Sequence, residues 1–275
     1  MASFQVLLPV AVLAGFVGAM SGLGGGVVLV PALTLLGVDI KHAIAVSMLC
    51  IIATSSSSAS TYARRHIANL KVGAFLEMFT ILGALAGASI TLAISPEPLY
   101  VVFGLVLLGS WVALWLAQRQ TQHESAQDRF SRWLELDGSY PDSALGQTID
   151  YRARRAYLGG AVMFGAGIIA GLLGIGAGAV NVLTQDLIMG LPPKVSTTTS
   201  NLIIGVTALA GTSVYLAAGL INPSLAAPVI LGVALGAYLG SRLLVRLTNQ
   251  AIRRLFLFIL LILAAEMIVR GIKGA

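Results

Sequence analysis

Two clusters of glycine interrupt long apolar runs in this 275-residue sequence. The first is SGLGGG at 21–26, and the second is GIGAG at 174–178. Glycine lowers helix stability by about 1 kcal/mol relative to alanine, so each cluster predicts a break in a helix. The helix that restarts after each break, near Val27 and near Ala179, presents unpaired N–H groups and a positive dipole end. Such helix ends attract anions, and glycine lets a ligand approach the backbone closely.

Polar side chains follow the second cluster closely. The stretch KVSTTTSN at 194–201 opens the next apolar segment, and its last two residues lie roughly 10 Å past Lys194 if the segment is helical. Hydroxyl and amide donors there suit a small oxyanion. The candidate substrate-binding residues are Gly22, Gly24, Gly25, Gly26, Ser47, Gly174, Gly176, Gly178, Asn181, Thr197, Ser200 and Asn201.

These residues also have a purely structural interpretation. Small residues let membrane helices pack closely, and this is the role we expect for Gly83, Gly87, Gly236 and Gly240. Serine and threonine hydroxyls often bond a carbonyl of their own helix. For the threonines of 194–201, this structural role and a binding role are equally compatible with the sequence. The serine-rich stretch at 54–58 is expected to pack between helices or to line a solvated mouth.

The composition places these breaks in a membrane. The chain is 57% hydrophobic and only 10% charged, against roughly 25% charged in soluble domains. Residues 1–38 carry no charge, and several other uncharged runs match the thickness of a bilayer core. We therefore expect an all-α polytopic membrane protein whose partner is the lipid bilayer. No cleaved signal peptide is expected, because the first 40 residues lack a basic region.

The chain reads as a duplication. At an offset of 153 residues, Ser47 aligns with Ser200 and Gly83 with Gly236. We expect two transmembrane repeats, 1–117 and 156–275, around a polar insert at 118–155. Each repeat begins with a glycine-broken segment and continues with three spans. The expected broken segments are 4–37 and 156–190, and the expected spans are 43–63, 72–95, 98–117, 195–218, 224–247 and 251–270.

The positive charges predict that the second repeat is inverted. The loop with Arg64 and Arg65 is basic while its counterpart near 217–224 is uncharged, and the bias is reversed for the next pair of loops. Inversion needs an odd number of crossings in each repeat, so each broken segment should be a hairpin without a net crossing. In this topology the insert lies in the cytoplasm and both termini lie outside. It places 14 Lys and Arg residues on the cytoplasmic side and 3 on the outside. Eight simple crossings give a weaker split of 11 to 6.

No constellation for catalysis is present in the sequence. Cys50 is the single cysteine, and the three histidines lack metal-ligand spacing, so we expect no metal, no cofactor and no enzyme activity. The net charge of +6 resides in loops between spans and does not predict nucleic-acid binding. Glu77, Asp186 and Glu266 are candidates for proton coupling. Each also has an ordinary alternative: an interfacial position for the first two, and a pair with Arg270 for Glu266.

The chain resembles the TauE/SafE family of membrane transporters. The resemblance rests on GLGGGVVLVPAL and GIGAGAVNVL, each followed by a span that opens with AVSML or TTTSNL, and it covers nearly the whole chain apart from the insert. It implies transport of sulfite, sulfonates or related organosulfur anions across the bacterial cytoplasmic membrane, by export in some members and uptake in others. The second copy departs from the first, since Leu183 replaces Pro31 and Asn181 replaces Leu29.

These observations predict a secondary transporter that moves a small sulfur-containing anion by alternating access. One alternative is an anion channel that uses the same site, and a membrane enzyme or assembly factor is a third. The absence of an ATP-binding motif leaves an ion gradient, the membrane potential or a partner as the driving force. The sequence leaves open which anion is carried, in which direction, with which coupling ion, and whether the protein is a homo-oligomer.

Overall fold

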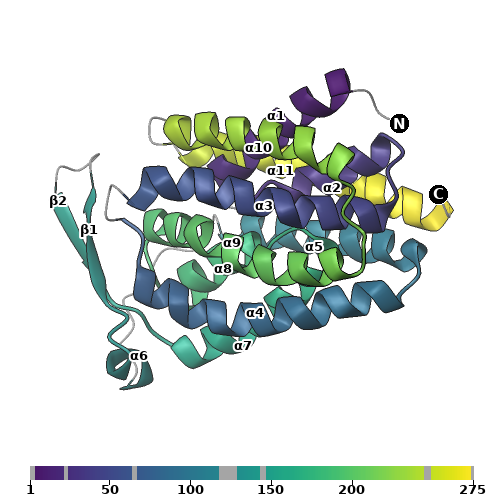
Figure 1. Cartoon of the computed structure of the whole chain (residues 1–275). Helices are drawn as coiled ribbons and strands as arrows, with labels where there is room; N and C mark the ends of the chain where they lie inside the picture. Colours follow the sequence, from purple (N-terminus) through teal and green to yellow (C-terminus); the bar gives the residue numbers. More distant parts are fainter. Residues whose placement is uncertain are drawn as a thin grey trace.

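The computed structural model describes residues 4–21, 24–63, 67–117, 129–142, 147–244 and 249–273, and these residues form a bundle of helices (Figure 1). Within them, five helices are long and apolar enough to cross a membrane, and three shorter helices are also apolar. The expected all-α polytopic membrane fold is confirmed. Apart from helices, the described residues contain one two-stranded β-hairpin.

The first half begins with two helices separated by the first glycine cluster. Three long helices follow them, with starts and ends within three residues of the predicted spans. The elements are α1 (Phe4–Ser21), α2 (Gly26–Leu35), α3 (Ile40–Ala63), α4 (Leu70–Ala93) and α5 (Pro96–Ala117).

The second half repeats this order after the polar insert. The described part of the insert holds a short helix and an antiparallel hairpin that pairs Gly138 with Tyr151. A π-helix, which the sequence did not predict, continues α8 before the next loop. The elements are α6 (Arg129–Trp133), β1 (Gly138–Asp142), β2 (Gln147–Tyr151), α7 (Ala156–Leu173), α8 (Gly178–Leu183), η1 (Thr184–Ile188), α9 (Pro193–Ala217), α10 (Pro223–Leu244) and α11 (Asn249–Lys273).

The two halves interlock, because each first helix packs on a helix of the other half. α1 packs along α10, and α7 packs along α4 (Figure 1). Glycines make both contacts close: Gly236 lies against the backbone of Val12 and Phe16, and Gly83 lies against the backbone of Phe164 and Ile168. Gly87 and Gly240 lie equally close to the facing helices. The packing role expected for these four glycines is confirmed.

Corresponding helices of the two halves meet at the centre and run antiparallel. On α3 and α9, Ser55 contacts Asn201 while Met48 contacts Gly211, so one residue number rises as the other falls. α5 and α11 are antiparallel for the same reason, since Gly104 faces Ala264 and Gly271 faces Val101. α3 and α9 lie between the α1–α10 layer and the α4–α7 layer (Figure 1).

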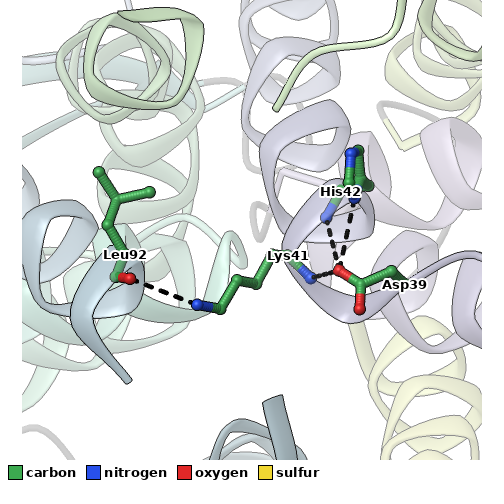
Figure 2. A network of polar contacts seen from close by, with 4 residues as sticks. All are labelled: Asp39, Lys41, His42 and Leu92. Carbon is green, nitrogen blue, oxygen red and sulfur yellow. Dashed lines mark hydrogen bonds and ion pairs between the residues drawn. The ribbon is translucent and has the colours of Figure 1, made fainter. Parts of the chain in front are cut away.

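The insert and the described chain ends lie at opposite ends of the bundle (Figure 1). At the insert end, Lys71 Nζ at the start of α4 lies 2.7 Å from Glu135 Oε2. Figure 2 shows the other end, where Lys41 Nζ at the start of α3 donates to the Leu92 carbonyl near the end of α4, at 3.4 Å. Asp39 Oδ1 accepts from the backbone N–H of Lys41 at 2.9 Å and from that of His42 at 3.5 Å, and so caps the first turn of α3.

The second broken segment begins and ends at the same end of the bundle. The backbone N–H of Arg154, just before α7, donates to the Met189 carbonyl just after η1, at 3.0 Å. The Arg154 side chain also lies against Gly190. The chain therefore enters the bundle along α7, breaks at the glycines, and returns along α8 and η1.

Candidate functional site

The first glycine break lies between the two central helices. Gly24 and Gly25 have φ angles of 81° and 76°, a left-handed conformation that side chains other than glycine's adopt at a cost. A Cβ added at Gly24 would lie 3.0 Å from Ile204 Cδ1 and 3.2 Å from Ile51 Cγ2. These isoleucines occupy corresponding positions of α9 and α3. The break thus sits where the two halves meet, while Gly22 lies outside the described residues.

The second break reaches the same place from the other half. Gly174 and Gly176 have φ angles of 66° and 70°, and α8 restarts at Gly178. The Gly174 carbonyl, which the broken helix leaves without a helical partner, accepts a hydrogen bond from Ser47 Oγ at 2.7 Å. Ser47 belongs to α3, so the first half satisfies a carbonyl that the break in the second half exposes.

The two breaks touch at Gly26, the first residue of α2. A Cβ added there would lie 2.7 Å from Ser47 Oγ and 3.0 Å from Ile175 Cα, and it would overlap the Gly174 carbonyl. Only glycine fits without a shift of the surrounding backbone. The sequence therefore predicted correctly that both clusters interrupt helices, and the structure brings the two interruptions together.

Ser200 and Asn201 lie in the same region, fully buried on α9. Ser200 Oγ donates to the Gly178 carbonyl at 3.3 Å. Asn201 Nδ2 donates to the Ala19 carbonyl on α1 at 3.4 Å, and Asn201 Oδ1 has no hydrogen-bond partner within the described structure. A buried polar atom without a partner is uncommon and is a reason to ask what it binds.

The threonines before Ser200 have structural partners. Thr198 Oγ1 donates to the Lys194 carbonyl of its own helix at 2.8 Å, and Thr199 Oγ1 accepts from the backbone N–H of Asn69 at 2.9 Å. For these two residues the structure favours the packing interpretation. Thr197 is half-buried.

Asn181 lies one turn into α8 and forms an amide pair that the sequence analysis missed. Gln185 Nε2 in η1 donates to Asn181 Oδ1 at 2.6 Å, and both side chains are buried. Gln185 Oε1 has no hydrogen-bond partner within the described structure. The available signal in the sequence was the spacing of Asn181 and Gln185, which are four residues apart in an apolar run and so lie on one face of a helix. The corresponding residues of the first half are Leu29 and Leu33, so this polarity belongs to one half.

The three intramembrane acids have different surroundings. Glu266 accepts from Arg270 Nε at 3.1 Å, which confirms the expected pair, and Arg270 Nη1 also donates to the Thr34 carbonyl at the end of α2. Asp186 is half-buried in η1. Glu77 is only 7% exposed, and Thr207 Oγ1 of α9 donates to its Oε1 at 2.7 Å. Glu77 therefore lies inside the helix bundle, and its depth in the membrane stays a prediction.

Metal chemistry finds no support in the described part of the chain, which holds no group of three or more His, Cys, Asp or Glu side chains placed to share an ion. The candidate site consists of backbone groups, hydroxyls and carboxamides. Such groups can bind and release a small polar solute, because the hydrogen bonds that they form are reversible.

The family model described as "Sulfite exporter TauE/SafE" matches residues 7–267. The chain belongs to the TauE/SafE family. The match includes both glycine breaks, α3 and α9.

Several relatives cover almost the same length. The probable membrane transporter protein YunE of Bacillus subtilis is 28% identical over 98% of this chain and 99% of its own length. YdhB of the same organism is 26% identical over 86% of this chain and 87% of its own, and YfcA of Escherichia coli K12 is 23% identical over 96% and 88%. Both are also named probable membrane transporter proteins. No solved structure matches this chain.

Proposed function

We propose that this TauE/SafE protein is a secondary transporter that moves a small sulfur-containing anion, such as sulfite or an organosulfonate, across the cytoplasmic membrane. The observation that carries the proposal is the meeting of the two glycine breaks at Gly26 and Gly174. Non-helical backbone at membrane depth is tolerated where protein or a water-filled cavity surrounds it. Discontinuous helices that meet at mid-depth are the usual site of substrate binding in secondary transporters.

The chemistry of the breaks suits an anion. The first turn of α2 directs backbone N–H groups and a positive dipole end toward the meeting point. Ser47, Ser200 and the Asn201 amide surround the breaks, and a serine hydroxyl can rotate from a backbone carbonyl to a ligand oxygen. The sulfur-containing class of the anion comes from the family's description as a sulfite exporter.

The packing supports an inverted repeat and alternating access. Corresponding helices α3 and α9 are antiparallel, and the swapped pairs α1–α10 and α4–α7 use glycines at corresponding positions. Two halves related in this way can rock against each other around a central site. The insert contains six of the Lys and Arg residues and lies at one end of the bundle, which supports a cytoplasmic location for that end.

A matched pair of glycine variants tests the site. Gly24 and Gly37 have nearly equal φ angles of 81° and 82°, so an alanine at either position costs about 1–2 kcal/mol of backbone strain. Gly37 has no atom within 4 Å of an added Cβ. We expect Gly24→Ala to weaken anion binding at least tenfold and Gly37→Ala to leave binding unchanged. Both should lose stability through the shared backbone strain, and Gly24→Ala should lose more because its Cβ crowds Ile204 and Ile51.

The measurement is binding of sulfite, thiosulfate, sulfoacetate, taurine and sulfate to the purified protein, beside its melting temperature. Equal affinities in the two variants would contradict a site at the first break. Binding of none of the five anions would contradict the proposed substrate class. Faster exit of labelled anion from proteoliposomes when unlabelled anion is outside is expected of a carrier and not of a channel.

A further inference from the structure

A single buried carboxylate bridges two helices in the half of the bundle that contains α4, α7 and α9. Glu77 lies on α4 and is 7% exposed. Its Oε1 accepts from Thr207 Oγ1 of α9 at 2.7 Å, and its Oε2 lies 3.2 Å from Thr80 Oγ1 one turn along α4. Carboxylates at membrane depth are rare and mark ion or proton pathways more often than structure.

The partners of Glu77 are hydroxyls and not cations. The titratable or charged side chains on α4 and on the two long helices packed against it, α7 and α9, are Lys71, Tyr157, Lys194 and Tyr215. The short helix α6 also packs on α4, through Phe130 and Phe75, and carries Arg129 and Arg132. Lys71 pairs with the exposed Glu135, Tyr157 is exposed, and Tyr215 donates to the Gly171 carbonyl. Lys194 lies in the first turn of α9. No hydrogen bond or ion pair described in the structure joins any of these side chains to Glu77.

The hydrogen bonds around Glu77 accommodate both of its protonation states. When the carboxylate is ionised, the Thr80 hydroxyl donates its hydrogen to Oε2. When the carboxyl is protonated, Oε2–H donates to Thr80 Oγ1, and the Thr80 hydrogen turns to the Leu76 carbonyl at 3.2 Å. Thr207 donates to Oε1 in either state. A proton can therefore enter and leave without a change in packing.

The other half provides an internal comparison. Ile230 occupies the position that corresponds to Glu77, and Thr54 corresponds to Thr207. Without a carboxylate opposite, Thr54 Oγ1 donates to the Cys50 carbonyl of its own helix at 3.1 Å. Helix packing at this position thus does not require an acid, and the buried carboxylate belongs to one half only.

Glu77 contacts α9 directly and reaches α7 through its neighbour Thr80, and these two helices carry the second half of the candidate site. Thr207 follows Ser200 by two turns of α9, about 10 Å along the helix axis. Thr80 lies with its backbone against Gly167 of α7, the helix that ends at the second break. A change at Glu77 can therefore reach the hairpin tip and α9 together.

We propose that Glu77 binds a proton when an anion binds at the glycine breaks, so that the protein is a proton–anion symporter. This inference rests on the proposed function. Two negative charges about 10 Å apart in a protein interior repel each other enough to change an affinity about tenfold. Anion binding therefore favours the protonated carboxyl. The carboxylate takes H⁺ from the aqueous phase that supplies the anion and releases H⁺ to the phase that receives it.

The first experiment needs no substrate. Infrared difference spectra of the protein in lipid, recorded between acid and alkaline pH, should contain a protonated-carboxyl band from a buried group. We expect Glu77→Gln to remove this band and Glu266→Gln to keep it, because Glu266 is paired with Arg270. A spectrum without a band assignable to Glu77 over the whole range would overturn the proposal.

The second experiment uses thiosulfate, which does not titrate near neutral pH, and sulfoacetate as probes. In the wild-type protein, affinity should fall about tenfold as pH rises through the Glu77 titration, and binding should take up protons from unbuffered solution. Glu77→Gln mimics the protonated form, so its affinity should be high and independent of pH. Thr207→Val should shift the pH dependence. Ser213→Ala on the same helix is the control and should behave as wild type, because the Ser213 hydroxyl bonds the Ala210 carbonyl on an exposed face.

The two failures are distinguishable. If neither probe binds while the infrared band titrates, the proposed substrate class is at fault and Glu77 still exchanges a proton. If a probe binds with the same pH dependence in the wild type and in Glu77→Gln, the symport inference is wrong and the anion site stands.

Discussion

Hydroxyl groups stabilise the glycine breaks by bonding the carbonyls that the breaks expose. Ser47 donates to the Gly174 carbonyl, and Ser200 donates to the Gly178 carbonyl. A broken helix leaves such groups without partners, and a bilayer interior offers no water to replace them. At the scale of single residues, the hydroxyl donors of the proposed site are therefore bonded to the protein itself, and a ligand would have to compete for them.

Removing the Ser47 hydroxyl should destabilise the fold. Ser47→Ala leaves the buried Gly174 carbonyl without its donor, and we expect a loss of about 1–3 kcal/mol. The measurement is the free energy of unfolding in detergent. Ser89→Ala is the control: its hydroxyl bonds the Leu85 carbonyl of the same helix at 2.8 Å on an exposed face, and its loss should change stability by less than about 0.5 kcal/mol. An equal, small effect of both changes would contradict a supporting role for Ser47.

The candidate residues themselves were predictable from the sequence, but their partners were not. Glycine clusters inside apolar runs indicate broken helices directly. The contact of Glu77 with Thr207, by contrast, depends on the register between α4 and α9, which pack side by side although 130 residues separate the two side chains. No local pattern encodes that register, so the partner of Glu77 could not be predicted from the sequence.

At the scale of elements, close glycine contacts determine how the helices pack. Gly83 and Gly236 permit backbone-to-backbone contact at corresponding places of the α4–α7 and α1–α10 pairs. Membrane helices associate largely through such van der Waals packing, since lipid is as apolar as their side chains.

Alanine at these contacts should separate the helices. A Cβ added at Gly236 would lie 2.8 Å from the Phe16 nitrogen, and one added at Gly83 would lie 2.8 Å from the Ile168 nitrogen. We expect each change to cost roughly 1–3 kcal/mol of stability by overpacking. Gly109→Ala and Gly165→Ala are the controls, because nothing lies within 4 Å of their added Cβ atoms. If the Gly83 and Gly236 variants melt at the same temperature as the two controls, close glycine contacts do not determine the packing.

Helix positions could be predicted well, and the π-helix could not. Asn222 and Pro223 predicted the boundary between two spans, and α10 begins at Pro223. The π-turn of η1 follows α8 without a sequence signal, because one extra residue per turn is a response to tertiary packing. The hairpin in the insert, which pairs Gly138 with Tyr151, was also not predicted from the sequence.

At the scale of the whole molecule, the two ends of the bundle differ in what they carry. The insert lies at one end and the described chain ends lie at the other (Figure 1). The split of 14 to 3 basic residues predicts that the insert end faces the cytoplasm.

Single-cysteine labelling in intact cells tests this topology. The background is Cys50→Ala, which removes the single, buried cysteine. We expect an impermeant reagent to label Lys273→Cys from outside and to reach Glu135→Cys only after the membrane is permeabilised. Both native side chains are exposed, so neither substitution disturbs the core. Labelling of both positions from the same side would contradict the topology.

The packing of α1 on α10 has a consequence for biosynthesis. The ribosome completes α1 at residue 21 and does not begin α10 until residue 223. At about 5–20 residues per second, roughly ten to forty seconds pass before α1 meets its partner. During that interval its glycine-lined face is bare within the lipid, open to mispairing with other nascent segments. Chains that terminate before residue 223 never make this partner helix, so the face of α1 that packs on α10 stays uncovered in them.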